Sequence, residues 1–191
     1  FGSVVLASVT LVGAPVAFRL DQAGVRVLLI DRGEPGHGTS GSSFAWANSN
    51  QKTPRDYFEL NYAGLREHRK LRDELGDAPW LHEGGNLVWP QDDAELEARV
   101  ARLTAWGYAA EWWPTSRANA SLEPHLRFSE PQTRIAFFPD ECWIDAPLLA
   151  SSLVERARQL GAETHFGAPL EAVELASGRV IAVNLGQRGR I

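Results

Sequence analysis

The feature that most constrains the fold is a strand–helix–strand pattern completed within the first 31 residues. Residues 3–9 are apolar and β-branched, which predicts a buried strand. Residues 11–23 carry apolar side chains near helical spacing, and Gly24 follows where a glycine commonly ends a helix. Residues 25–30 predict a second buried strand, closed by Asp31. Two strands joined in this way pair in parallel through a right-handed crossover, so an α/β fold is expected.

The turn after the first strand has the order of a dinucleotide-binding motif but few of its glycines. In that motif the helix start offers N–H groups to a pyrophosphate, glycines let the backbone approach it, and an acid after the second strand binds the ribose. The G-x-G-x-x-G frame reads SVTLVG over residues 8–13, so only Gly13 is kept and Thr10 adds a branched side chain. Asp31, 23 residues after Ser8, is the candidate ribose ligand. By pattern alone, an ordinary βαβ unit stays open.

The α/β pattern is interrupted in the middle of the chain and then resumes. Residues 32–50 form a long loop rich in Gly, Ser and Asn, and such loops are usually functional or disordered. We predict a doubly lobed α/β fold, with a Rossmann-like lobe from residues 1–50 and 140–191 and an inserted α+β lobe from residues 51–139. Beyond the first βαβ unit, helices are predicted at 53–75, 92–106 and 146–160, and strands at 86–89, 109–113, 133–138, 163–166, 170–174 and 179–185. Thr53 and Asp145 are the predicted N-caps of the first and last of these helices, and residues 176–178 are the predicted turn between the last two strands.

Charge and cysteine content exclude several classes of protein. The formal net charge of −5 argues against a nucleic-acid binder driven by phosphate contacts. The single cysteine, Cys142, excludes an internal disulfide and a multi-cysteine metal site, so we predict a cytoplasmic protein, with peripheral membrane association left open. No apolar run reaches the roughly 18 residues that span a bilayer, and the apolar start lacks the basic leader of a signal peptide. The start at Phe1 and the absence of Met fit a fragment.

Other chemistry-bearing residues give weaker signals. The five histidines have no metal-ligand spacing, so no metal site is expected. Cys142 is interpreted as a buried or half-buried thiol rather than a reactive one. Asp140 and Glu141 are interpreted as a strand-end turn. The basic residues between 66 and 72 are interpreted as a solvated helix face.

Four stretches of the chain resemble FAD-dependent oxidoreductases of the D-amino-acid oxidase superfamily, which includes glycine oxidase, sarcosine oxidase and D-amino acid dehydrogenase. Residues 11–33, LVGAPVAFRLDQAGVRVLLIDRG, resemble the family's opening. Residues 34–54, EPGHGTSGSSFAWANSNQKTP, are similar to its Thr-Ser segment and the loop at the flavin. WIDAPLL at 143–149 and GAETHFGAPLEAVELASGRVIAV at 161–183 resemble the helix and strands that return to the FAD lobe. The resemblance keeps the family's order over nearly the whole chain.

The resemblance implies FAD as cofactor and assigns residues to it. The turn and helix start would face the pyrophosphate, with Gly13 allowing close packing of helix on strand. Asp31 would bind the adenosine ribose, with Arg32 beside the adenine. The implied cofactor-binding residues are Ser8, Thr10, Leu11, Gly13, Asp31, Arg32, Thr39, Ser40, Ser43, Trp46, Asn48 and Leu170.

The later members of that set have simpler interpretations as well. Thr39 and Ser40 would bind the phosphates or the ribityl chain, or they shape a turn. Residues 43–48 would lie near the isoalloxazine ring, although Trp46 could be a packing residue. Leu170 stands where the family has a Val whose backbone pairs with the adenine edge, and it is a core residue on either interpretation.

The implied activity is oxidation of an amine or D-amino acid, or of a glycine- or sarcosine-like substrate. Hydride would pass to flavin N5, giving an imine and then a keto acid and ammonia. The resemblance assigns no catalytic residue, and family members are about twice as long, so a missing C-terminal half or a second chain is expected to complete the fold. Two alternatives stay open: a degenerate, non-catalytic nucleotide-fold module that binds a partner chain, and NAD binding, because Asp31 suits either dinucleotide.

Overall fold

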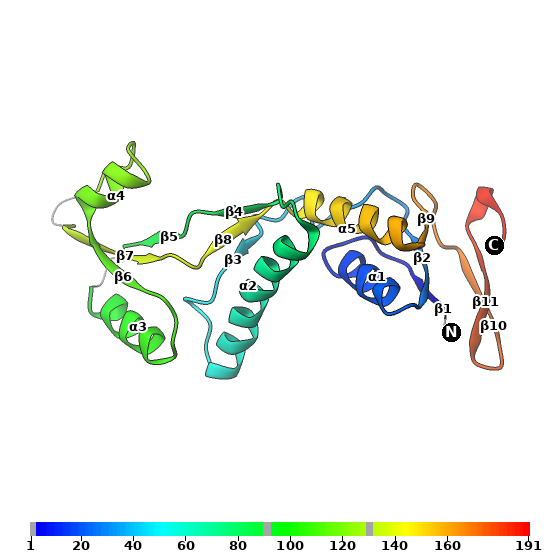
Figure 1. The fold of residues 1–191 in the computed structure, drawn as a ribbon, viewed down its shortest axis with the longest axis horizontal. Helices are drawn as coiled ribbons and strands as arrows, with labels where there is room; N and C mark the ends of the chain where they lie inside the picture. The colour runs from blue at the N-terminus through cyan, green and yellow to red at the C-terminus, as the bar shows by residue number, and fades with distance from the viewer. Residues whose placement is uncertain (1–2, 90–92, 129–131) are drawn as a thin grey trace. The chain divides into compact units, whose positions relative to one another are not determined.

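The computed structural model describes residues 3–89, 93–128 and 132–191 and divides the chain into two compact units (Figure 1). Unit 1 comprises Phe1–Ala45 and Asp145–Ile191, and unit 2 comprises Trp46–Ile144. The sequence-based prediction places the lobe boundaries near residues 50 and 140. Asp92, the predicted start of one helix, lies outside the described residues.

Unit 1 contains the predicted βαβ crossover. Strand β1 (Ser3–Leu6) leads into helix α1 (Gly13–Gln22) and then into β2 (Arg26–Ile30), which pairs with β1 in parallel. Strand β9 (Glu163–His165) pairs in parallel with the other side of β2, so the sheet order is β1-β2-β9. The expected α/β fold with a parallel sheet is therefore confirmed.

Helix α5 (Ala146–Leu160) packs beside α1 in the same unit (Figure 1). Its start is fixed by Asp145, whose Oδ1 accepts a hydrogen bond from Leu148 N at 2.9 Å, as expected of an N-cap. Leu149 and Leu153 are buried one helical turn apart, so an apolar stripe faces the unit's core.

A hairpin closes unit 1. Strands β10 (Ala172–Ala176) and β11 (Arg179–Asn184) pair antiparallel, and a short 3-10 helix, η1 (Gly186–Arg188), follows them. The turn at residues 177–178 lies where the sequence predicts it. Ile30, at the end of β2, is buried in one apolar cluster with Ala168, which precedes the hairpin, Val183, which lies on β11, and Leu185, which directly follows β11.

Unit 2 holds two antiparallel three-stranded sheets and three helices. One sheet has the order β3-β8-β4 and the other the order β5-β7-β6. The strands are β3 (Trp46–Ala47), β4 (Leu81–Glu83), β5 (Asn86–Val88), β6 (Glu111–Pro114), β7 (Arg134–Phe138) and β8 (Cys142–Ile144), and the helices are α2 (Arg55–Leu75), α3 (Asp93–Ala105) and α4 (Thr115–Ser121).

Several elements of unit 2 differ from the sequence prediction. Strands β3, β4 and β8 and helix α4 are absent from it, because elements of two to seven residues carry too little periodicity to be recognised. Helix α2 begins at Arg55, and Pro54 occupies its N-cap position in place of the predicted Thr53. Proline has no side-chain oxygen, so no N-cap side chain accepts a hydrogen bond from the first N–H groups of α2.

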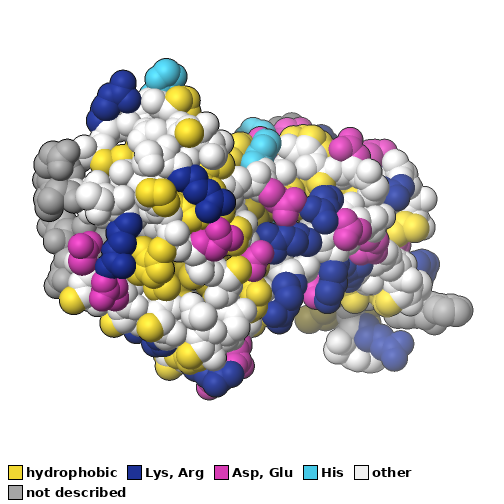
Figure 2. Space-filling model, turned by 60° about the vertical axis from the view of Figure 1, so that its left-hand side comes forward, with side chains coloured by type: hydrophobic (Ala, Val, Ile, Leu, Met, Phe, Trp, Pro, Cys, Tyr) yellow, Lys and Arg dark blue, Asp and Glu magenta, His cyan; other side chains and the backbone are white. Residues whose placement is uncertain are grey.

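Of the basic residues of α2 predicted to lie on a solvated face, Arg66 and Lys70 are exposed, whereas Arg69 and Arg72 are half-buried. Arg69 and Arg72 approach the carboxylate of Glu83, on β4, at 2.8 and 2.6 Å. Figure 2 shows basic and acidic side chains intermixed on the face that it draws. Exposed pairs of this kind contribute only about 0–1 kcal/mol each.

Candidate functional site

A cavity of about 670 Å³ lies in unit 1, where the carboxyl ends of β1 and β2 meet the loop that follows β2. This is the edge at which parallel α/β sheets bind ligands. Six of the predicted cofactor residues line it. The lining residues are Ala7, Ser8, Thr10, Ile30, Asp31, Arg32, Gly33, His37, Gly38, Thr39, Pro169 and Leu170.

Asp31 is held in the wall of this cavity by backbone N–H groups. Its Oδ2 accepts a hydrogen bond from Val9 N at 2.7 Å, and its Oδ1 accepts one from Gly33 N at 2.9 Å. The carboxylate therefore ties the turn after β1 to the turn after β2. Each oxygen of an ionised carboxylate can accept a further hydrogen bond, so a ligand hydroxyl can still bind.

Gly13 permits the close approach of α1 to the end of β1. A Cβ atom on Gly13 would lie 1.8 Å from the carbonyl oxygen of Ser8, so any side chain there would push the helix away from the strand. The one glycine kept from the motif thus has the packing role expected of it. Thr10 stands where the motif has a glycine, and its Oγ1 accepts a hydrogen bond from Val12 N at 3.2 Å at the helix start.

The loop after β2 is folded back onto the end of β1. Gly36 N donates to the carbonyl oxygen of Val9 at 2.9 Å, and Leu11 N donates to the buried Ser40 Oγ at 3.4 Å. Gly36 has a φ of +76°, and a Cβ atom there would lie 2.4 Å from Pro147 Cα. Ser40 therefore shapes the loop beneath the cavity, whereas Thr39 lines the cavity itself.

Ser43, Trp46 and Asn48 are not among the residues that line this cavity. Ser43 is exposed, and its Oγ accepts a hydrogen bond from Ala45 N at 3.0 Å. Trp46 and Asn48 belong to unit 2, where Trp46 lies on β3 and pairs with Trp143 on β8. Asn48 Nδ2 donates to the carbonyl oxygen of Trp46 at 3.2 Å, while its Oδ1 is buried without a partner among the described residues.

Sequence reasoning missed several residues of the cavity. His37 and Gly38 line the cavity, although neither is among the residues predicted to bind the cofactor. The signal for both is their place in the glycine-rich loop directly after the acid of the motif. The missed role of Gly33 follows from a local pattern, because an Asp commonly accepts a hydrogen bond from the N–H two residues later.

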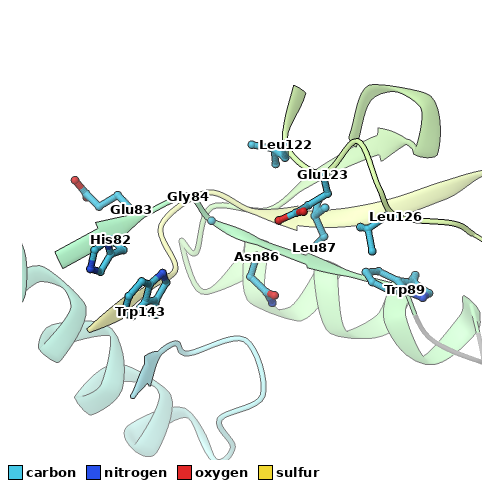
Figure 3. Close-up of a pocket in the computed structure, with 11 residues that line it drawn as sticks. His82, Glu83, Gly84, Asn86, Leu87, Trp89, Leu122, Glu123, Leu126 and Trp143 are labelled. Atoms are coloured by element: carbon cyan, nitrogen blue, oxygen red, sulfur yellow. The ribbon is translucent and has the colours of Figure 1, made fainter. Parts of the chain in front are cut away.

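A second cavity, of about 590 Å³, lies wholly within unit 2 (Figure 3). His82 on β4 and Trp143 on β8 stack in its wall, with ring centroids 3.7 Å apart and planes at 10°. Asn86 and Leu87 leave β5 on opposite sides, as successive strand residues do (Figure 3). Trp89, Glu123 and Leu126 are among the other lining residues.

Unit 2 also contains a fully buried carboxylate, Glu141, at the turn between β7 and β8. Its Oε1 accepts hydrogen bonds from Asn50 N at 3.3 Å, Asn50 Nδ2 at 2.8 Å and Tyr108 Oη at 2.8 Å, and its Oε2 accepts one from Asn50 Nδ2 at 2.9 Å. Burial raises the pKa of Glu141, and burial together with the adjacent carboxylate raises the pKa of Tyr108. The predicted turn at Asp140 and Glu141 is present, but the burial of Glu141 was not predicted from the sequence.

The other weak candidates lie in ordinary surroundings. Cys142 is buried, and burial raises the pKa of its thiol to about 11, which disfavours the reactive thiolate. Across residues 3–89, 93–128 and 132–191, no group of three or more His, Cys, Asp and Glu side chains could hold a metal ion. The helices in those ranges are all too short or too polar to cross a membrane.

Comparison with known proteins gives a consistent family. A family model described as FAD dependent oxidoreductase (DAO) matches residues 11–191. A search of curated proteins finds no match.

Solved structures share the fold at low sequence identity. Glycine oxidase from Geobacillus kaustophilus superposes with a TM-score of 0.79 at 19% identity, covering 100% of this chain and 53% of the other. L-amino acid deaminase from Proteus vulgaris gives 0.78 at 18%, covering 99% and 44%, and L-proline dehydrogenase from P. horikoshii gives 0.77 at 17%, covering 100% and 50%. The chain thus spans about half the length of the structures it matches.

Proposed function

The chain belongs to the DAO family of FAD-dependent oxidoreductases, and from this premise we propose that unit 1 binds the adenosine and pyrophosphate part of FAD in its cavity. The observation that carries the proposal is the placement of Asp31. Its carboxylate lies in the cavity wall at the end of β2, fixed by two N–H groups and able to accept more hydrogen bonds.

The lining of the cavity fits that part of the cofactor. Asp31 would accept hydrogen bonds from the ribose hydroxyls, and Arg32 and Leu170 would flank the adenine. The start of α1, with Ser8 and Thr10 before it, would face the pyrophosphate, because a helix N-terminus attracts anions. A volume of about 670 Å³ also falls in the usual range of small-molecule sites, roughly 300–1,000 Å³.

A second group of residues would serve the flavin ring. The resemblance assigns Ser43, Trp46 and Asn48 to it. The buried Oδ1 of Asn48 lacks a partner among the described residues, and a buried acceptor normally has one. An N–H group of the isoalloxazine ring is a donor of the required kind, which supports the assignment.

We propose oxidation of an amine or amino acid as the reaction. Bound FAD would supply a two-electron acceptor that takes hydride at N5 from the substrate α-carbon, leaving an imine that water hydrolyses to a keto acid and ammonia. The task of the chain is to hold the cofactor and orient the substrate, since this transfer depends chiefly on position. Similar structures bear the names glycine oxidase, L-amino acid deaminase and L-proline dehydrogenase, which supports an amino acid substrate.

Unit 2 would be the substrate lobe. Its cavity, with the stacked His82 and Trp143, offers an aromatic wall, and the carboxylate of Glu123 could accept a hydrogen bond from a substrate amine. A further segment of about the same length, or a second chain, would complete both lobes. The single cysteine and its buried thiol support a cytoplasmic location.

The proposal is tested by the visible absorption of the purified protein. We expect an oxidised-flavin spectrum, or its appearance when FAD is added, and bleaching of that spectrum by a substrate from a panel of amines, glycine, and D- and L-amino acids. A protein that neither carries flavin nor takes up added FAD would refute the proposal.

One alternative has an observation in its favour: a degenerate, non-catalytic module that binds a partner chain. The Thr10 side chain lines the cavity where the motif has a glycine. Restoring glycine with Ser8→Gly and Thr10→Gly separates the two functions. A gain of FAD affinity in the double variant rejects the alternative, whereas absence of FAD binding in both proteins favours it.

A further inference from the structure

We infer that Glu141 is a positioning residue: its buried carboxylate fixes the segment Trp46–Asn50, which contains Trp46 and Asn48, two of the residues that the proposed function assigns to the flavin ring. The inference rests on that proposed function. It concerns a residue that contacts neither cavity's assigned ligand and acts through Asn50 and Tyr108.

The segment is anchored on both sides of Asn48. On one side, Trp46 and its neighbour pair with β8, the strand that begins directly after Glu141. On the other side, the backbone and side chain of Asn50 both donate to Glu141. Asn48, with its unpartnered buried oxygen, therefore lies between two anchors that share one short stretch of chain.

Tyr108 links the same carboxylate to the residue between the anchors. Its hydroxyl donates to Glu141 Oε1 at 2.8 Å and accepts from Ser49 N at 3.2 Å. Ser49 is itself fully buried, and its Oγ donates to the carbonyl oxygen of Phe58 at 3.4 Å. Each of the two residues after Asn48 is thus held by the carboxylate, directly or through one hydroxyl.

The cost of this arrangement indicates a specific role. Burial removes the Glu141 carboxyl group completely from water, and none of the described residues forms an ion pair with it. The nearby cation Arg69 instead binds Glu83 and the backbone oxygen of Asp140. A buried acid without a cation is expensive compared with an apolar residue of similar volume, and hydrogen bonds from a defined set of donors compensate only at this geometry.

The test compares Glu141→Gln with a stability-matched control in the FAD-loaded protein. Glu141→Gln keeps the volume but replaces one acceptor with a donor that faces Asn50 Nδ2. Ile135→Ala truncates a buried β7 residue that packs in the cluster of Trp113, Ala118 and Phe137, so it lowers the stability of unit 2 away from the Glu141 network. We expect Glu141→Gln to weaken FAD binding about tenfold, to shift the flavin reduction potential and to speed amide exchange at residues 48–50, with Ile135→Ala leaving potential and spectrum unchanged.

Three results overturn the inference. The first is an unchanged flavin potential and unchanged exchange at residues 48–50 in Glu141→Gln, while wild type binds FAD, which leaves the proposed function standing. The second is an equal change in Ile135→Ala, which reduces Glu141 to a source of stability. The third is a wild-type protein without FAD, which removes the proposed function as well. If Glu141→Gln does not fold, Tyr108→Phe, which deletes one donor, should shift the potential in the same direction.

Discussion

Asp31 in unit 1 and Glu141 in unit 2 are both carboxylates held by hydrogen bonds from the chain, and the two units use them in different ways. Asp31 in unit 1 is half-buried, and its two donors come from backbone 22 and 2 residues away. Glu141 in unit 2 is fully buried, and its donors lie 91 and 33 residues away. Asp31, held by two backbone N–H groups at a cavity wall, can still accept hydrogen bonds from a ligand. Glu141, enclosed by Asn50 and Tyr108, can only position those two residues.

The largest expected effect tests the enclosed acid. Glu141→Ala leaves two buried donor groups of Asn50 and the hydroxyl of Tyr108 without an acceptor, so we expect the free energy of unfolding to fall by about 3 kcal/mol. Urea denaturation measures it. Glu95→Ala, which removes an exposed partner of Arg99, should cost less than about 1 kcal/mol. Equal losses in the two variants would erase the distinction between a buried and an exposed acid.

The next effect contrasts a helical glycine in each unit. Gly13→Ala forces a Cβ atom against the carbonyl oxygen of Ser8, and we expect a loss of about 2 kcal/mol and weaker FAD binding. Gly64→Ala in α2 meets no atom within 4 Å, so it should raise stability by about 0.5–1 kcal/mol through helix propensity. Thermal unfolding of both variants measures the difference. Stabilisation by Gly13→Ala would show that α1 does not depend on close contact with β1.

The smallest effect is the pH dependence that Glu141 contributes to stability. Burial raises the pKa of Glu141 above its ordinary value near 4.5, so the folded protein binds more protons than the unfolded chain between these two pKa values. The free energy of unfolding should therefore fall as pH rises through that window, because protonation favours the folded state. Urea denaturation at a series of pH values measures the slope. Glu141→Gln should flatten it, and a variant that keeps the full slope would assign the effect to another group.

The parts of the fold that could be predicted from the sequence are those set by local residue patterns. The βαβ unit, the Asp145 cap and the turn between β10 and β11 follow from apolar periodicity, an N-cap residue and a turn sequence. The cavity wall at Asp31 follows as well, because the motif places the acid at the end of β2.

The remainder depended on contacts between distant segments. The short strands β3, β4 and β8 form only when brought together, since two or three residues have no recognisable period. Glu141 reads as an ordinary turn acid until Asn50 and Tyr108 enclose it. His37 reaches the cavity because the glycine-rich loop folds back, a path that composition does not encode.

The most direct test of the account is an FAD titration of wild type and Asp31→Ala, followed by flavin absorption. We predict that wild type binds FAD and that Asp31→Ala binds it at least about tenfold more weakly, with Glu155→Ala, an exposed acid on α5, binding like wild type. Equal FAD affinity in wild type and Asp31→Ala would contradict the assignment of the unit 1 cavity to the cofactor.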